Sequence, residues 1–148
     1  MTRWGTRLAM IVVVLTALGC AALHPAPATG AMWGFFTDST KLIAPRANTW
    51  LGNGAVVYAK SESACREARA NVEGRTPCLN LMVTSGAGHY ALVLPSHVPV
   101  NAFTPESLPG GVTIATPARE RCEAIRSAFI TIYSVMGDCE PIRVERLQ

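Results

Sequence analysis

The sequence has few of the residues that most catalytic and metal sites need. Its 148 residues include three histidines and only two aspartates, Asp38 and Asp138. It contains no Cys-x-x-Cys pair, no Gly-x-Ser-x-Gly motif and no phosphate loop with a Walker lysine. A zinc ribbon, a thioredoxin-type site, a nucleophile elbow and a nucleotide-binding loop are therefore unsupported. We expect no metal, no cofactor and no enzymatic activity.

Long hydrophobic runs are also missing. The longest apolar stretch, Leu8 to Leu18, has eleven residues, whereas a membrane-spanning helix needs roughly 20. Arg3 and Arg7 precede this stretch and small residues follow it, which is the pattern of a cleaved export signal. We therefore expect residues 1–19 to be a signal peptide and the mature protein to lie outside the reducing cytosol.

The end of this segment reads Leu15-Thr16-Ala17-Leu18-Gly19-Cys20. It resembles the lipobox of bacterial lipoproteins, although the leucine usually found three places before the cysteine stands one place late. The resemblance implies that Cys20 becomes the first mature residue and carries acyl chains, which would anchor the protein in a membrane. It also implies a periplasmic or membrane-anchored location on the cell envelope. Ordinary cleavage further on, after Ala22, Ala28 or Ala31, is the alternative.

The mature chain has almost no net charge. The formal charge of +3 includes Arg3 and Arg7, and without them eleven basic residues face ten acidic ones. This balance gives no basis for a nucleic-acid partner. Residues 20–31 are rich in alanine and proline and are expected to form a tether. Residues 32–148 are then long enough for a single domain with one core.

Four cysteines remain after Cys20, namely Cys65, Cys78, Cys122 and Cys139. An even number in an exported chain predicts two structural disulfides, and four cysteines allow three pairings. The first two are separated by twelve residues and the last two by sixteen.

An internal duplication organises these cysteines. Segments 51–84 and 108–146 each present a glycine, a short β-branched run, a helix start, Cys-x-x-x-Arg and a second cysteine before another apolar run. The aligned identities are Leu51/Leu108, Gly54/Gly111, Cys65/Cys122 and Arg69/Arg126. Coincidence between two amphipathic helices is the alternative. The order of features predicts a small α+β domain of two strand–helix–strand units around a mainly antiparallel sheet, braced by disulfides.

Local signals place the elements. Ser61 or Ser63 is suited to cap a helix from Glu62 to Val72, and Thr116 followed by Pro117 to start a second helix. Apolar positions at spacings of three and four put Cys122, Ile125, Phe129, Ile132 and Met136 on one stripe of that helix. Residues 79–84 and 89–94 are expected to be strands of a hairpin whose turn is Ser85-Gly86-Ala87-Gly88, and residues 140–144 a last strand.

The second helix sets a geometric condition on its cysteine. If it reaches Met136, Cys122 lies roughly 21 Å from its end, and three further residues span at most about 10 Å. A disulfide needs Cα atoms within about 7 Å. Therefore either the helix ends by about Tyr133 or Cys122 does not pair with Cys139.

The overall arrangement is similar to small exported bacterial proteins of unknown activity, in which a capped helix with Cys-x-x-x-Arg follows a strand. We expect a non-enzymatic envelope protein with a lipid anchor, acting as a binding or accessory domain with an envelope protein as its partner. Its candidate surface is the Gly-rich turn with the Pro-rich segment 95–111. The alternatives are a small exported hydrolase and a component of an envelope or secretion assembly.

Few side chains stand out for these alternatives. A hydrolase would need His89 or His97 near Ser85 or Ser96 and Asp38. An assembly component would expose an apolar patch around Trp33, Phe35 and Phe36, which we expect instead to join the core. Arg69 and Arg126 are expected to face solvent or to pair with a nearby carboxylate.

Overall fold

The computed structural model describes residues 26–38, 42–44, 49–72, 74–94, 98–99, 107–108, 111–130 and 137–148, without the side chains of 42–44, 49–50, 98–99, 107–108 and 130. The elements in chain order are β1 (Gly30–Thr37), β2 (Leu42–Ala44), β3 (Thr49–Trp50), β4 (Ala55–Ala59), α2 (Glu62–Asn71), β5 (Leu79–Val93), β6 (Val98–Pro99), β7 (Ser107–Leu108), β8 (Thr113–Thr116), α3 (Arg119–Ile130) and β9 (Glu140–Arg146). The expected signal peptide and Cys20 lie outside the described residues.

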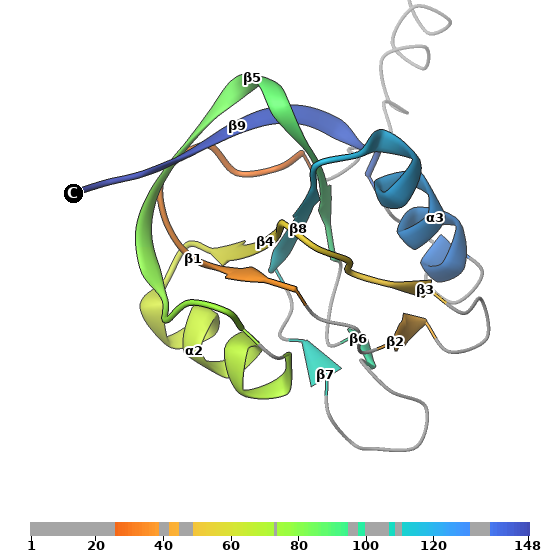
Figure 1. Ribbon diagram of the computed structural model, residues 1–148, viewed down its shortest axis with the longest axis horizontal. Helices are drawn as coiled ribbons and strands as arrows, with labels where there is room; N and C mark the ends of the chain where they lie inside the picture. The colour runs from red at the N-terminus through yellow and green to blue at the C-terminus, as the bar shows by residue number, and fades with distance from the viewer. Residues whose placement is uncertain are drawn as a thin grey trace, which may run out of the picture.

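Five of these strands form one antiparallel sheet in the order β1-β4-β8-β5-β9. Because β5 also pairs with β1, the strands β1, β4, β8 and β5 make a closed ring of four (Figure 1). The expected antiparallel α+β domain is confirmed in outline. The protein is nevertheless mainly β, and its sheet closes, a feature that hydrophobic periodicity does not indicate.

The long strand β5 makes this closure possible. Its first half pairs with β1 and its second half with β8, while β9 pairs with residues in both halves, from Leu81 to Ala91. Ser85 and His89 both lie opposite Ile142, so the three residues between them bulge out of the ladder. Gly86 and Gly88 take positive φ angles of 148° and 153° there. The prediction of a hairpin turn at 85–88 is therefore wrong, because these glycines bend one strand instead of reversing the chain.

The strands contribute buried residues to two clusters, one on each face of the sheet. One face packs against both helices and includes Phe35, Val57, Leu92 and Ile114. The opposite face packs strand against strand and includes Met32, Val56, Tyr58, Leu81, Val83, Ala91, Ala115 and Ile142. Alternate residues of β4 belong to the two clusters, so all five of its residues are buried.

Gly34 lets β1 fit between its two neighbours. It pairs with Tyr58 on β4 and with Leu79 on β5. A Cβ atom at this position would lie 2.5 Å from Leu81 Cδ1 and 2.8 Å from both Tyr58 Cβ and Val57 O. Only glycine can occupy this position without displacing a neighbour.

The two helices lie against different parts of the ring. Helix α2 contacts β1 and β4, while α3 contacts β5, β8 and the short strands β2 and β3 (Figure 1). The units β4–α2–β5 and β8–α3–β9 follow the predicted strand–helix–strand order. No helix in the described part of the chain is long and apolar enough to cross a bilayer.

The predicted first residue is correct for α2 but not for α3. Ser61 is the N-cap of α2, and its hydroxyl accepts a hydrogen bond from Ala64 N at 3.2 Å. Helix α3 begins at Arg119, two residues later than the predicted Pro117. Thr116 still belongs to β8, and its hydroxyl donates to Ala118 O at 2.9 Å. Pro117 therefore belongs to the connection between strand and helix.

The chain joins the domain earlier than the predicted boundary at residue 32. Gly30 and Ala31 already belong to β1, where they pair with Val83 and Met82 of β5. Pro27 is buried, and Ala28 O accepts a hydrogen bond from Tyr58 Oη at 3.4 Å. The predicted boundary is therefore too late, and residues 20–25 of the expected tether lie outside the described residues.

Candidate functional site

Two disulfides tie the helices to the sheet. Cys65 on α2 is bonded to Cys78 just before β5, with Cα atoms 6.2 Å apart. Cys122 on α3 is bonded to Cys139 just before β9, with Cα atoms 6.1 Å apart. The prediction of two structural disulfides is confirmed, with one bridge in each strand–helix–strand unit. Bridges of this kind form and persist in an oxidising, extracytoplasmic environment.

The second bridge satisfies the condition on helix length. Helix α3 ends at Ile130, before Tyr133. This end leaves residues 131–138 to return to Cys139. Cys122, Ile125 and Phe129 are buried on the predicted stripe, whereas Ile132 and Met136 lie outside the described residues.

Each disulfide is accompanied by an arginine clasp, which we define as the arginine four residues after the helix cysteine and the carbonyl that it binds. Arg69 Nε donates to Thr76 O at 2.7 Å. Arg126 Nε donates to Gly137 O at 2.9 Å. In both units the accepting carbonyl belongs to the residue two places before the second cysteine. The Cys-x-x-x-Arg motif, which occurs twice, thus makes the same hydrogen bond in both units, which the spacing of the motif alone does not predict.

The two clasps differ in how the rest of the guanidinium is engaged. Arg126 Nη2 lies 3.1 Å from Asp138 Oδ1, and its Nη1 lies 3.9 Å from Glu123 Oε2. Of the two alternatives expected for this arginine, pairing with a nearby carboxylate is therefore the one observed. Arg69 has no carboxylate partner among the residues that the structure describes.

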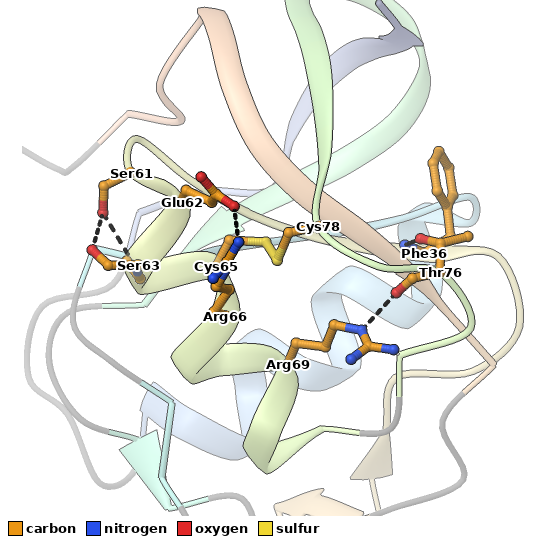
Figure 2. The surroundings of a disulfide bond; sticks show 10 residues. Phe36, Ser61, Glu62, Ser63, Cys65, Arg66, Arg69, Thr76 and Cys78 are labelled. Carbon is orange, nitrogen blue, oxygen red and sulfur yellow. Dashed lines mark hydrogen bonds and ion pairs between the residues drawn. A yellow bond between two sulfur atoms is a disulfide. The ribbon is translucent and has the colours of Figure 1, made fainter.

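A surface hollow of about 320 Å³ lies over the first disulfide. It is lined by Glu62, Arg66, Arg69, Ala70, Pro77 and Cys78. Figure 2 shows the disulfide between helix α2 and the segment before β5, with the Arg69 side chain reaching towards Thr76. The hollow therefore joins two guanidinium groups to the apolar surfaces of a proline, an alanine and a disulfide.

Charge in and around the hollow is unevenly balanced. Glu62 pairs with Arg66 one helical turn away. Arg75 pairs with a carboxylate that does not line the hollow, since its Nη1 lies 3.5 Å from Asp38 Oδ2. Arg69 is consequently the cation of this group that has no carboxylate beside it among the described residues.

Two of the residues considered for a hydrolase, His89 and Asp38, have other partners. The ring nitrogen Nε2 of His89 lies 3.2 Å from the Gly54 carbonyl oxygen. Asp38 pairs with Arg75, and Asp138 pairs with Arg126. His24, Ser96 and His97 lie outside the described residues, as does most of the segment 95–111. Within the described ranges, no three metal-ligating side chains are close enough to hold an ion.

The aromatic residues after the tether join the core. Phe35 is fully buried between the sheet and the helices, and Trp33 packs against the same cluster. Phe36 packs on the opposite face, with the Arg146 guanidinium 4.7 Å from its ring centre. The expectation that this segment contributes to the core is confirmed.

One buried tyrosine carries a displaced pKa. Burial raises the pKa of the Tyr58 hydroxyl well above its ordinary value of 10.0, and the charge of Glu140 adds to this shift. A hydrogen bond with Thr113 acts in the opposite direction. This group remains neutral at physiological pH, and its place is inside the sheet rather than at the hollow.

Comparison of the chain with protein-family models, curated proteins and solved structures gives no match. The chemistry available to the hollow is therefore inferred from its own residues.

Proposed function

We propose that this chain is a non-enzymatic exported domain of the bacterial cell envelope, held at a membrane by a lipid on Cys20, and that it serves as a binding or accessory module. The observation that carries the binding role is the hollow over the Cys65–Cys78 bridge. Export and the lipid anchor are supported by the pattern of residues 1–20 and by the two disulfides that cross-link both helices. A rigid, covalently braced surface suits a protein that must keep its shape outside the cell.

The side chains of the hollow favour binding over catalysis. An arginine side chain stays protonated at all physiological pH values, so it can hold an anion but does not exchange protons during a reaction. Glu62 is engaged by Arg66, and the sulfur of Cys78 is part of a disulfide and is not a free nucleophile. The groups around the hollow therefore support recognition of a ligand or partner.

The position of β1 argues against two of the three alternative cleavage sites. Cleavage after Ala31 would remove Gly30 and Ala31, which pair with β5. Cleavage after Ala28 would remove Pro27, which is buried, and the Ala28 carbonyl that accepts the hydrogen bond from the Tyr58 hydroxyl. Processing before Cys20, or after Ala22, would leave these contacts intact. Seven residue steps from Cys20 to Pro27 would keep the domain within roughly 25 Å of the anchor.

The test is the chemical form and location of the exported protein. The full chain, carrying a C-terminal tag, is expressed in a bacterial host, and the membrane and soluble extracytoplasmic fractions are separated. We expect mass spectrometry to find an acylated N-terminal Cys20 in the membrane fraction, and the Cys20→Ala variant to move to the soluble fraction. An unmodified terminus after Ala22 would overturn the anchor, and a cytoplasmic protein with free thiols would overturn export as well.

A further inference from the structure

The two strand–helix–strand units supply an internal comparison for the hollow. Cys65 and Cys122 are equivalent, as are Arg69 and Arg126, whose Nε atoms make the same hydrogen bond in the two clasps. On Arg126 the remaining nitrogens face two carboxylates, from the residue three places before it and from the residue just before the second cysteine. The second unit therefore shows that a guanidinium held in this way binds carboxylates when the chain itself supplies them.

The first unit has different residues at both of these positions. Arg66 stands where the second unit has Glu123, and Pro77 stands where it has Asp138. Both of these replacements line the hollow, together with Arg69. The first unit thus has an arginine and a proline where the second unit has two carboxylates. An open hollow of about 320 Å³ lies beside them.

From this comparison we infer that the hollow binds a carboxylate-bearing ligand, whose carboxylate contacts Arg69 where Asp138 and Glu123 contact Arg126. This inference rests on the proposed function as a binding module and names the chemistry of its ligand. The hydrogen bond to Thr76 O holds Nε of Arg69 and so orients the planar guanidinium in advance. A guanidinium held in this way presents paired N–H donors to the two oxygens of a carboxylate.

The lining also bears on the rest of the ligand. Ala70, Pro77 and the disulfide provide apolar surface beside the charged groups. A volume of about 320 Å³ is on the order of ten water molecules. A short carbon chain with one or two carboxylates fits this space, either as a free acid or as an acidic side chain of a partner protein. Arg66 is placed to assist a second carboxylate once Glu62 releases it.

The test titrates the full exported chain with succinate at an ionic strength of about 20 mM, because salt screens pairs between exposed charges. Side-chain NMR of the arginine Nε–Hε groups reports each site separately. We expect the Arg69 resonance to shift with a dissociation constant in the millimolar range, while the Arg126 resonance stays in place. A capped Gly-Glu-Gly peptide forms the second arm, and the tighter of the two probes identifies a free acid or a side chain as the source.

Variants follow from the comparison of the units. Arg66→Glu installs the carboxylate that Glu123 supplies in the second unit, so it should weaken succinate binding by at least about tenfold while Arg69 keeps its clasp. Arg143→Gln removes the same type of charge from an exposed position on β9 and should leave binding unchanged. The reverse experiment, Glu123→Gln with Asp138→Asn, should create a second shifting resonance at Arg126.

Several results would overturn the inference. Glu73 follows Arg69 by four residues in the sequence, and succinate binding that is seen only with Glu73→Gln would mean that the chain supplies its own carboxylate. Inorganic phosphate binding more tightly than both carboxylate probes would reject the ligand class. Equal binding by wild type and Arg66→Glu would reject the site. A protein that is exported and anchored but gives no shift at Arg69 refutes this inference and leaves the proposed location standing.

Discussion

Removing each disulfide in turn measures how much this fold depends on an oxidising compartment. The variants are Cys65→Ala with Cys78→Ala, and Cys122→Ala with Cys139→Ala, so that no free thiol remains. The bridges close loops with sequence separations of 13 and 17 residues. The chain-entropy estimate for loops of these sizes gives roughly 3 kcal/mol of stabilisation for each, with a difference of about 0.2 kcal/mol between them.

Packing around the bridges separates the two variants only slightly. Cys65 and Cys122 are each 1% exposed and sit in the same cluster between sheet and helices. Of their partners, Cys139 is buried and Cys78 is partly buried, so alanine removes slightly more buried sulfur in the second variant. The arginine clasps remain in both variants because they bind backbone carbonyls. We therefore expect nearly equal losses. Removing both bridges should cost about 6 kcal/mol, and domains are typically stable by only about 5–15 kcal/mol.

The assay is thermal unfolding of the purified protein, followed by far-ultraviolet circular dichroism. For a domain of about 120 residues, 3 kcal/mol corresponds to a decrease in Tm of roughly 12 °C. The wild-type protein in excess dithiothreitol should lose about twice as much and approach the unfolded state at 37 °C. Losses below about 1 kcal/mol for either bridge, or a difference above about 1.5 kcal/mol between them, would contradict the loop-closure reasoning.

Three further substitutions probe other parts of the structure. Gly34→Ala should destabilise the protein by about 3 kcal/mol in urea unfolding, because its Cβ would meet Leu81 and the β4 backbone; an unchanged midpoint would mean that the strands separate easily. Ser61→Ala removes the cap that binds Ala64 N and should cost about 1 kcal/mol, which a Ser61→Asp variant should restore. Stability should fall above a pH of about 10, because Tyr58 then loses its proton in the unfolded chain but keeps it in the folded one. Tyr58→Phe should remove this part of the alkaline decrease, and an identical pH profile for the variant would refute its assignment.

Local sequence signals located most of the elements. Each cysteine pair, the Ser61 cap, the stripe of Cys122, Ile125 and Phe129, and the last strand depend on residues close in the chain, whose spacing alone carries the information. The same applies to the end of α3, because the length of a helix and the reach of three residues are simple geometry. These features were accessible because their physical causes are local.

The predictions for residues 85–88 and 116–117 were wrong because a strand distant in the sequence pairs with each segment. Ser85-Gly86-Ala87-Gly88 has the composition of a turn, but β9 pairs on both sides of it and keeps β5 continuous. Thr116-Pro117 has the composition of a helix start, but Thr116 is held in β8 by its pairing with Tyr90 of β5. In both cases a partner strand from elsewhere in the chain decides between two conformations that the local sequence permits.

The candidate site combines both kinds of information. The sequence contains two copies of the Cys-x-x-x-Arg motif, and Arg66 stands in the first unit where Glu123 stands in the second. Neither feature by itself indicates a binding site. The carbonyl partners of the two arginines and the hollow beside one of them emerge only when the segment before each second cysteine folds back onto its helix.

The sequence by itself determined the two units and their cysteines, because these depend on residue type and short-range spacing. Only the tertiary structure decided that the sheet closes, that β5 bends instead of turning, and that one arginine is neutralised while its counterpart faces an open hollow. Those outcomes depend on pairing and packing between segments that are far apart in the chain. The spacing of residues in the sequence does not show which distant segments lie close together in space.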